Sequence, residues 1–164
     1  MYAGSLIRQQ LLKAVPTLAL AALVILGAGA VPAQAASPTG AEIIRLTNQE
    51  RQKAGLAPLA EDATLANVAE NYAALMAQRQ QLGHRIDGTS PGDRLTAAGY
   101  RWSSLGENIA ENYPDAGAVV QGWMNSPGHR ANILDPNVTQ IGVGVATSSA
   151  GVPYYCQVFA QPAR

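Results

Sequence analysis

Cysteine is almost absent from this 164-residue chain, and charged residues are scarce. The one cysteine, Cys156, excludes an intramolecular disulfide framework and a cysteine-based zinc finger. Only 13% of the residues are charged and the formal net charge is zero, which excludes a strongly basic nucleic-acid binder and a polyacidic tail protein. The chain also has no glycine-rich phosphate loop. We therefore expect a fold held together by packing and a partner that is not a nucleic acid.

The shortage of charge is most severe at the start of the chain. Residues 1–35 contain no acidic residue, and Arg8 and Lys13 are their only basic ones. An apolar stretch follows and ends at Ala33-Gln34-Ala35, a site of the small-x-small type that signal peptidase cleaves. The uninterrupted apolar run, Leu18–Val31, has 14 residues, whereas a membrane span needs about 20. The pattern predicts a secretory signal peptide over 1–35, cleaved after Ala35.

Residues 36–164 have the length of one ordinary domain. They carry 9 basic and 11 acidic side chains, a formal net charge of −2. We expect a monomer that is secreted into the extracellular space or held at the cell wall, with no membrane span after cleavage. Cys156 has no partner in the chain, so we expect an inert, buried thiol.

Helices are predicted over the first part of this domain. The boundaries expected from capping and stop signals are 37–55, 62–83, 90–99 and 115–126. In the second helix, Leu65, Ala69, Tyr72 and Met76 form one apolar stripe with a period of 3.6 residues, and Gly83 is its expected stop. The third helix begins with a capping signal, Ser90-Pro91-Gly92-Asp93.

Strands are predicted only at the end of the chain. Residues 141–146 alternate between apolar side chains and small ones, residues 147–153 form a turn, and residues 154–161 form a second strand rich in aromatic residues. That strand is apolar on both of its faces, which indicates burial on both sides. The expected fold is α+β, a sheet covered by helices on each side. Trp102 and Trp123 are predicted to lie in the core.

The candidate catalytic or metal-binding residues include the two histidines of the chain, each of which follows a glycine. His84 lies just after the expected end of the second helix, and His129 follows Ser126-Pro127-Gly128, which is typical of a type II turn. Glu107 lies between them in the sequence. Two imidazoles and a carboxylate can form a zinc-type site with an open position, but the spacing is too wide for a local ligand motif. From the residues alone, solvated turn histidines are the alternative. No G-x-S-x-G motif supports a serine hydrolase.

Six segments occur in an order that resembles a known family. They are Asn48-Gln49-Glu50-Arg51, Gly83-His84, Gly106-Glu107-Asn108-Ile109, Trp123-Met124-Asn125-Ser126-Pro127-Gly128-His129-Arg130-Ala131-Asn132-Ile133-Leu134, Ile141-Gly142-Val143-Gly144 and Tyr154-Tyr155-Cys156-Gln157-Val158-Phe159. Together they resemble the CAP superfamily, the SCP-like extracellular domain of cysteine-rich secretory proteins, venom antigens and plant pathogenesis-related proteins. The similarity covers residues 40–161, and the short segment from tryptophan to histidine resembles the bacterial branch.

The resemblance implies a three-layer α-β-α sandwich with a cleft that binds a divalent ion such as zinc in several members. By motif, His84, Glu107 and His129 match three of the four cleft residues. The second acid of the family lies where this chain has Ser126, so the set is incomplete and any metal site is expected to be weak. Asn108, Gly128 and Asn132 support the motif.

Three hypotheses for function follow. The first is a secreted binding module for a small lipid-like ligand or a protein partner, which the resemblance implies. The second is a metal-dependent hydrolase or peptidase, in which metal held by His84 and His129 activates water and Glu107 acts as the base. The third is an interaction role in which the cleft is vestigial. The missing acid at Ser126 favours the first and third, so we expect a non-catalytic protein.

Overall fold

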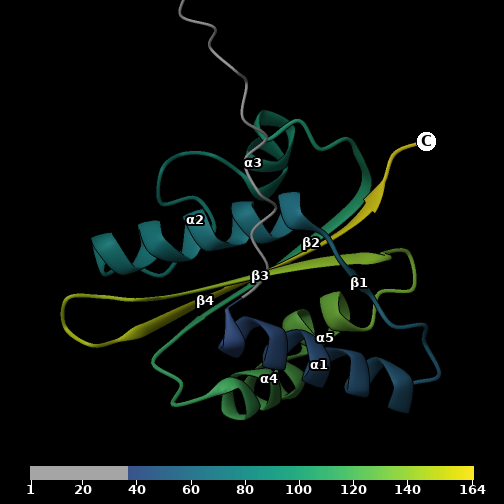
Figure 1. Ribbon diagram of the computed structural model, residues 1–164, viewed down its shortest axis with the longest axis horizontal. Coiled ribbons are helices and arrows are strands. Elements are labelled where there is room, and N and C mark those ends of the chain that lie inside the picture. The colour runs from purple at the N-terminus through teal and green to yellow at the C-terminus, as the bar shows by residue number, and fades with distance from the viewer. Residues whose placement is uncertain (1–36) are drawn as a thin grey trace, which may run out of the picture. The chain divides into compact units, whose positions relative to one another are not determined.

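The computed structural model describes residues 37–164, so the predicted signal peptide and its cleavage site lie outside the described residues. Figure 1 shows a sheet with helices on both of its faces. The helices are α1 (Pro38–Lys53), α2 (Ala63–Arg79), α3 (Pro91–Ala97), α4 (Ala116–Asn125) and α5 (Pro127–Ile133). The strands are β1 (Ala60–Glu61), β2 (Trp102–Glu111), β3 (Gln140–Thr147) and β4 (Pro153–Pro162). Within this described part, no helix is long and apolar enough to cross a membrane.

The sheet is mixed, with the strand order β1-β3-β4-β2. β3 and β4 form the predicted antiparallel hairpin, β2 is antiparallel to β4, and the short β1 is parallel to β3. One core, between the sheet and α1, α4 and α5, includes Trp123 and Phe159. The other, between the sheet and α2 and α3, includes Tyr72 and Val158. The three-layer sandwich is therefore confirmed, and β4 is buried on both faces as predicted.

Helix α2 lies directly on β3 because the small residues of that strand leave room for it. A Cβ atom placed on Gly142 would lie 2.1 Å from the carbonyl carbon of Leu65, and one placed on Gly144 would lie 2.2 Å from that of Ala69. The Asp62 side chain caps the helix, accepting from the backbone N–H groups of Thr64 and Leu65. The alternation of small and apolar residues in β3 thus fixes which face receives the helix.

The capping signals correctly predicted the starts of α1, α2, α3 and α4, and the capping box of Ser90 and Asp93 is formed. The predicted stop at Gly83 is wrong. Helix α2 ends at Arg79, with Gln80 in the left-handed conformation at a φ of 50°. The chain can therefore turn before it reaches the glycine, and Gly83 and His84 lie in the loop that follows.

Two further predictions were wrong in this part of the chain. Strand β2 lies between α3 and α4, so the strands are not confined to the end. Trp102, at the start of β2, is 38% exposed and not in the core, whereas Trp123 is 1% exposed as predicted. The Trp102 ring rests on Gly92, where an added Cβ would lie 2.9 Å from Cζ2 of the indole. The indole thus packs on the start of α3 and stays partly open to solvent.

Buried Arg51 joins α1 to the end of α5. Its Nη1 atom donates to the backbone carbonyls of Ile133 and Asp135, each at 2.8 Å, and its Nε atom donates to that of Ala57 at 2.9 Å. Burial lowers the pKa of this guanidinium, and the charge of Asp135 opposes that shift. These bonds fix α5, the helix that carries His129, against α1.

Candidate functional site

The candidate site lies at β2, an edge strand of the sheet. Successive side chains of a strand point to opposite faces, so Glu107 and Asn108 contact different helical layers. Glu107 approaches Cys156 and residues of the α2–α3 side, whereas Asn108 approaches Gln157 and residues of α5. Two adjacent residues therefore connect the edge of the sheet to both of its faces.

The Glu107 carboxylate is almost fully buried and both of its oxygens are engaged. Its side chain is 2% exposed. Oε1 lies 2.8 Å from Nδ1 of His84, and Oε2 accepts from Nη2 of Arg94 at 2.5 Å. The Cys156 thiol lies 3.7 Å from Oε2. Burial, followed by the charge of Glu107, raises the pKa of that thiol well above its ordinary value. Cys156 is thus buried as predicted, in surroundings that favour the protonated thiol.

Arg94 is a site residue that the sequence reasoning missed. Its guanidinium lies over the ring of Tyr72, 3.4 Å from the ring centroid. Nη1 donates to the backbone carbonyls of His84 at 3.2 Å and Thr89 at 3.0 Å, while Nη2 holds Glu107. A basic residue on the predicted helix between the His84 loop and Glu107 was the only signal for it. Arg94 thus holds both the loop and the carboxylate.

The loop that carries His84 is also tied to α2. The Tyr72 hydroxyl donates to the backbone carbonyl of Gly83 at 2.5 Å and accepts from the N–H of Ile86 at 3.2 Å. Burial is the main cause that raises the pKa of this phenol. The imidazole itself remains half exposed, with 50% of its surface accessible. Because Nδ1 faces Glu107, Nε2 is the ring nitrogen available to a ligand.

On the other face, Asn108 is the centre of a buried amide network. Its Nδ2 donates to the backbone carbonyl of His129 and to Oε1 of Gln157, each at 3.1 Å. Asn132 donates to Oδ1 of Asn108 at 2.9 Å and to the backbone carbonyl of Glu107 at 3.1 Å. Gln157 in turn donates to Oγ1 of Thr47 at 2.8 Å. These bonds hold α5 against the edge strand.

His129 lies on α5, and the predicted type II turn is wrong. Pro127 occupies the first turn of a helix whose N-cap is Ser126, and Gly128 does not adopt a positive φ. A proline φ near −65° suits the first turn of a helix as well as a turn, which is why the two were confused. Burial of the imidazole, and then the charge of His84, lower the pKa of His129.

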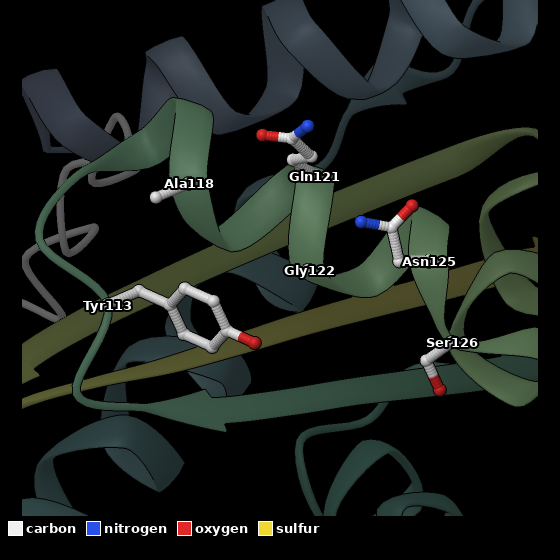
Figure 2. A pocket seen from close by; sticks show the side chains of 6 residues that line it. All are labelled: Tyr113, Ala118, Gln121, Gly122, Asn125 and Ser126. Carbon is white, nitrogen blue, oxygen red and sulfur yellow. The ribbon is translucent and has the colours of Figure 1, made fainter.

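A groove of about 440 Å³ lies beside His84 and Glu107. We call it the His84 groove; the residues that line it are His84, Ser90, Pro91, Gly92, Asp93, Thr96, Trp102, Leu105, Gly106 and Glu107. His129 is not among them. A second groove, also of about 440 Å³, is lined by Tyr113, Ala118, Gln121, Gly122, Asn125 and Ser126 (Figure 2). We call this one the Tyr113 groove.

Comparison with known proteins decides the family. The profile of the CAP group, the cysteine-rich secretory protein family, matches residues 44–159. The chain belongs to this family. It is 42% identical over 110 residues to the uncharacterized Bacillus subtilis protein YkwD, an alignment that covers 66% of this chain and 43% of YkwD.

Two solved structures support the fold of this CAP domain. An extracellular protein of Bacillus anthracis that contains an SCP domain has a TM-score of 0.70 at 35% identity, covering 75% of this chain and 40% of that one. An outer surface protein of Borrelia burgdorferi also has a TM-score of 0.70, at 23% identity, covering 74% of this chain and 90% of that one. This chain thus spans less than half of both Bacillus proteins.

The CAP domain brings only part of the expected residue set together. His84 and Glu107 are in direct contact, but Ser126, where the resemblance predicts the second family acid, lines the other groove. Among residues 37–164, no group of three or more His, Cys, Asp or Glu side chains is arranged to hold a metal ion. The engaged carboxylate of Glu107 and the hydroxyl of Ser126 do not fit a zinc site with three protein ligands.

Proposed function

We propose that this CAP domain is an extracellular, non-catalytic binding module that takes a small lipid-like ligand in the His84 groove. Export is supported by the signal-peptide pattern of residues 1–35 and by relatives described as an extracellular protein and an outer surface protein. The absence of catalysis is supported by one observation above all. Both oxygens of Glu107 are engaged, by His84 and by Arg94, in a side chain that is 2% exposed.

A general base must lie within hydrogen-bond reach of the water that it activates. The Glu107 side chain is 2% exposed and its oxygens face Arg94 and His84, so we assign it the role of an anchor for His84. This arrangement also removes it from the set of metal ligands. What is left is a pair of histidines, and that pair supports weak binding of a divalent ion at most.

The lining of the His84 groove indicates the class of ligand. Trp102 and Leu105 contribute apolar surface, and His84, whose Nδ1 is engaged by Glu107, also lines the groove. The carboxylates of Glu107 and Asp93 are already bonded within the protein. An apolar body with one polar head group matches this surface, and an exposed tryptophan is a typical anchor for such a ligand or for a protein partner.

Calorimetric titration of the full chain with dodecanoate, an amphipathic probe, tests the proposal. Trp102→Ala should weaken binding about tenfold, the loss typical of an aromatic anchor. Leu82→Ala is the matched control, because Leu82 is 41% exposed, close to the 38% of Trp102, and does not line the groove. Equal loss in both variants, or no binding by the unmodified chain, would contradict the lipid-like ligand and leave a protein partner as the occupant.

Zinc titration separates this function from the metal-dependent hydrolase. We expect no tight one-to-one binding of zinc, because only two histidines are free to act as ligands. His129→Ala is the control. Tight binding that this substitution abolishes would overturn the argument from Glu107 and favour the hydrolase.

A further inference from the structure

The Tyr113 groove is separate from the groove used above, and nothing in the proposed function involves it. It lies between α4 and the loop that follows β2, which carries Tyr113. Figure 2 shows the Tyr113 ring alongside α4, with its hydroxyl directed toward the end of the helix that carries Asn125 and Ser126. Its volume of about 440 Å³ lies within the range of small-molecule sites.

Within the described residues, the polar side chains of this groove have no hydrogen-bond partner. The side chains of Tyr113, Gln121, Asn125 and Ser126 make no hydrogen bond with any other residue of the described range 37–164. Ser126 is the N-cap residue of α5, but its hydroxyl makes no capping hydrogen bond to the backbone of that helix. Two amides and two hydroxyls therefore offer donors and acceptors together around one aromatic ring.

Tyr113 is held at its backbone by Tyr155, and its ring packs on α4. The buried Tyr155 donates its hydroxyl to the backbone carbonyl of Tyr113 at 2.8 Å, which fixes the loop. The ring packs on Gly122, where an added Cβ would lie 2.4 Å from the Tyr113 hydroxyl oxygen and 2.7 Å from Cζ. A glycine within a helix lowers stability relative to alanine, and here it makes room for the tyrosine. The shape of the groove therefore depends on the glycine at position 122, which lets the Tyr113 ring pack against the helix.

From these observations we infer that the Tyr113 groove binds a neutral saccharide. None of the described residues that line the groove is charged, so they offer no opposite charge to an anion or a cation. An apolar ligand would leave the amides of Gln121 and Asn125 desolvated without partners, which is unfavourable. A sugar matches both features, because its hydroxyl groups donate and accept while its C–H face packs on an aromatic ring.

Ligand-observed NMR with the full chain tests the inference, with maltotriose and N,N′,N″-triacetylchitotriose, two neutral trisaccharides, as probes. We expect at least one of them to bind in the millimolar range. Gly122→Ala should weaken that binding about tenfold or more, because the new methyl group displaces the Tyr113 ring. This variant should fold, since alanine favours the helix. Gln121→Ala with Asn125→Ala, two exposed positions, should weaken it similarly.

Gly117→Ala is the matched control. It makes the same substitution in the same helix, but its Cβ meets only the side chain of its neighbour Asp115 at 3.3 Å, and the position does not line the groove. It should keep the affinity of the unmodified chain.

Two results would overturn the inference. One is that neither saccharide binds; if a neutral peptide, acetyl-trialanine amide, then binds in a Gly122-dependent way, the ligand of the groove is a peptide. The other is that Trp102→Ala abolishes saccharide binding while Gly122→Ala retains it, which would place the sugar in the His84 groove.

Discussion

Replacing Arg94 with methionine should destabilise the protein severely. Methionine keeps an apolar stem over Tyr72 but leaves the Glu107 carboxylate, 2% exposed, without its cation. Breaking a buried ion pair in this way costs about 3–5 kcal/mol. The Arg94 side chain is 11% exposed and His84 still contacts the carboxylate, so we expect the lower end, about 3 kcal/mol. Loss of the cation–π contact adds about 0.5–2 kcal/mol.

The assay is urea unfolding of the full chain, followed by the fluorescence of the buried Trp123. A double variant, Arg94→Met with Glu107→Gln, is the control that isolates the charge. With no carboxylate left unpaired, it should recover about 2 kcal/mol relative to the single variant.

Two results would refute this reasoning. A loss below about 1 kcal/mol in the single variant would mean that the pair behaves like one on the surface. A double variant no more stable than the single one would mean that Arg94 acts through its packing on Tyr72 and its bonds to the loop. In either case Glu107 would be held less tightly than its contacts indicate, and the case against a catalytic base would weaken.

Three further predictions concern other parts of the fold. Burial lowers the folded-state pKa of His129, so the unfolded chain binds the proton more tightly, and stability should decline as the pH falls below about 6.5, the ordinary histidine value. His129→Gln should flatten that decline in unfolding measurements between pH 7.5 and pH 5, and an unchanged slope would contradict it. Gly142→Ala should cost about 3 kcal/mol in urea unfolding, because its Cβ would meet the Leu65 backbone at 2.1 Å; a neutral effect would show that α2 can shift. Gln80→Gly should raise the free energy of unfolding by about 0.5–1 kcal/mol, because Gln80 has a φ of 50°, and a loss would mean that its side chain matters more than its backbone.

The elements that could be predicted are those whose signals are local. A cap such as Asp62, followed by an apolar stripe, determines α2 within one stretch of chain, and the alternation in residues 141–146 likewise determines β3. Strand β2 was missed because Ser103, Ser104, Glu107 and Asn108 break the apolar pattern of a buried strand. The partners that satisfy its buried polar residues come from distant parts of the chain.

Helix α5 was missed for a different reason, which is that one residue pair fits two structures. Pro127-Gly128 suits a type II turn only if the glycine takes a positive φ. That angle cannot be predicted from the residue type, because glycine adopts positive and negative φ about equally readily. In the structure Gly128 continues a helix, with Asn132 one turn later bonded to the edge strand. These tertiary hydrogen bonds favour the helix, and they cannot be predicted from the residues next to Pro127 and Gly128 alone.

The sequence singled out two residues of the candidate site but missed the contact that determines the environment of Glu107. His84 and Glu107 were singled out as a ligand and a base, and they do meet at 2.8 Å. The residue that determines what Glu107 can do is Arg94, which has no motif of its own and becomes relevant only when α3 lies beside β2. The role of a carboxylate depends on its neighbours more than on its motif. The same pair of residues would suit a catalytic site without Arg94, and with Arg94 present they form part of the wall of the His84 groove.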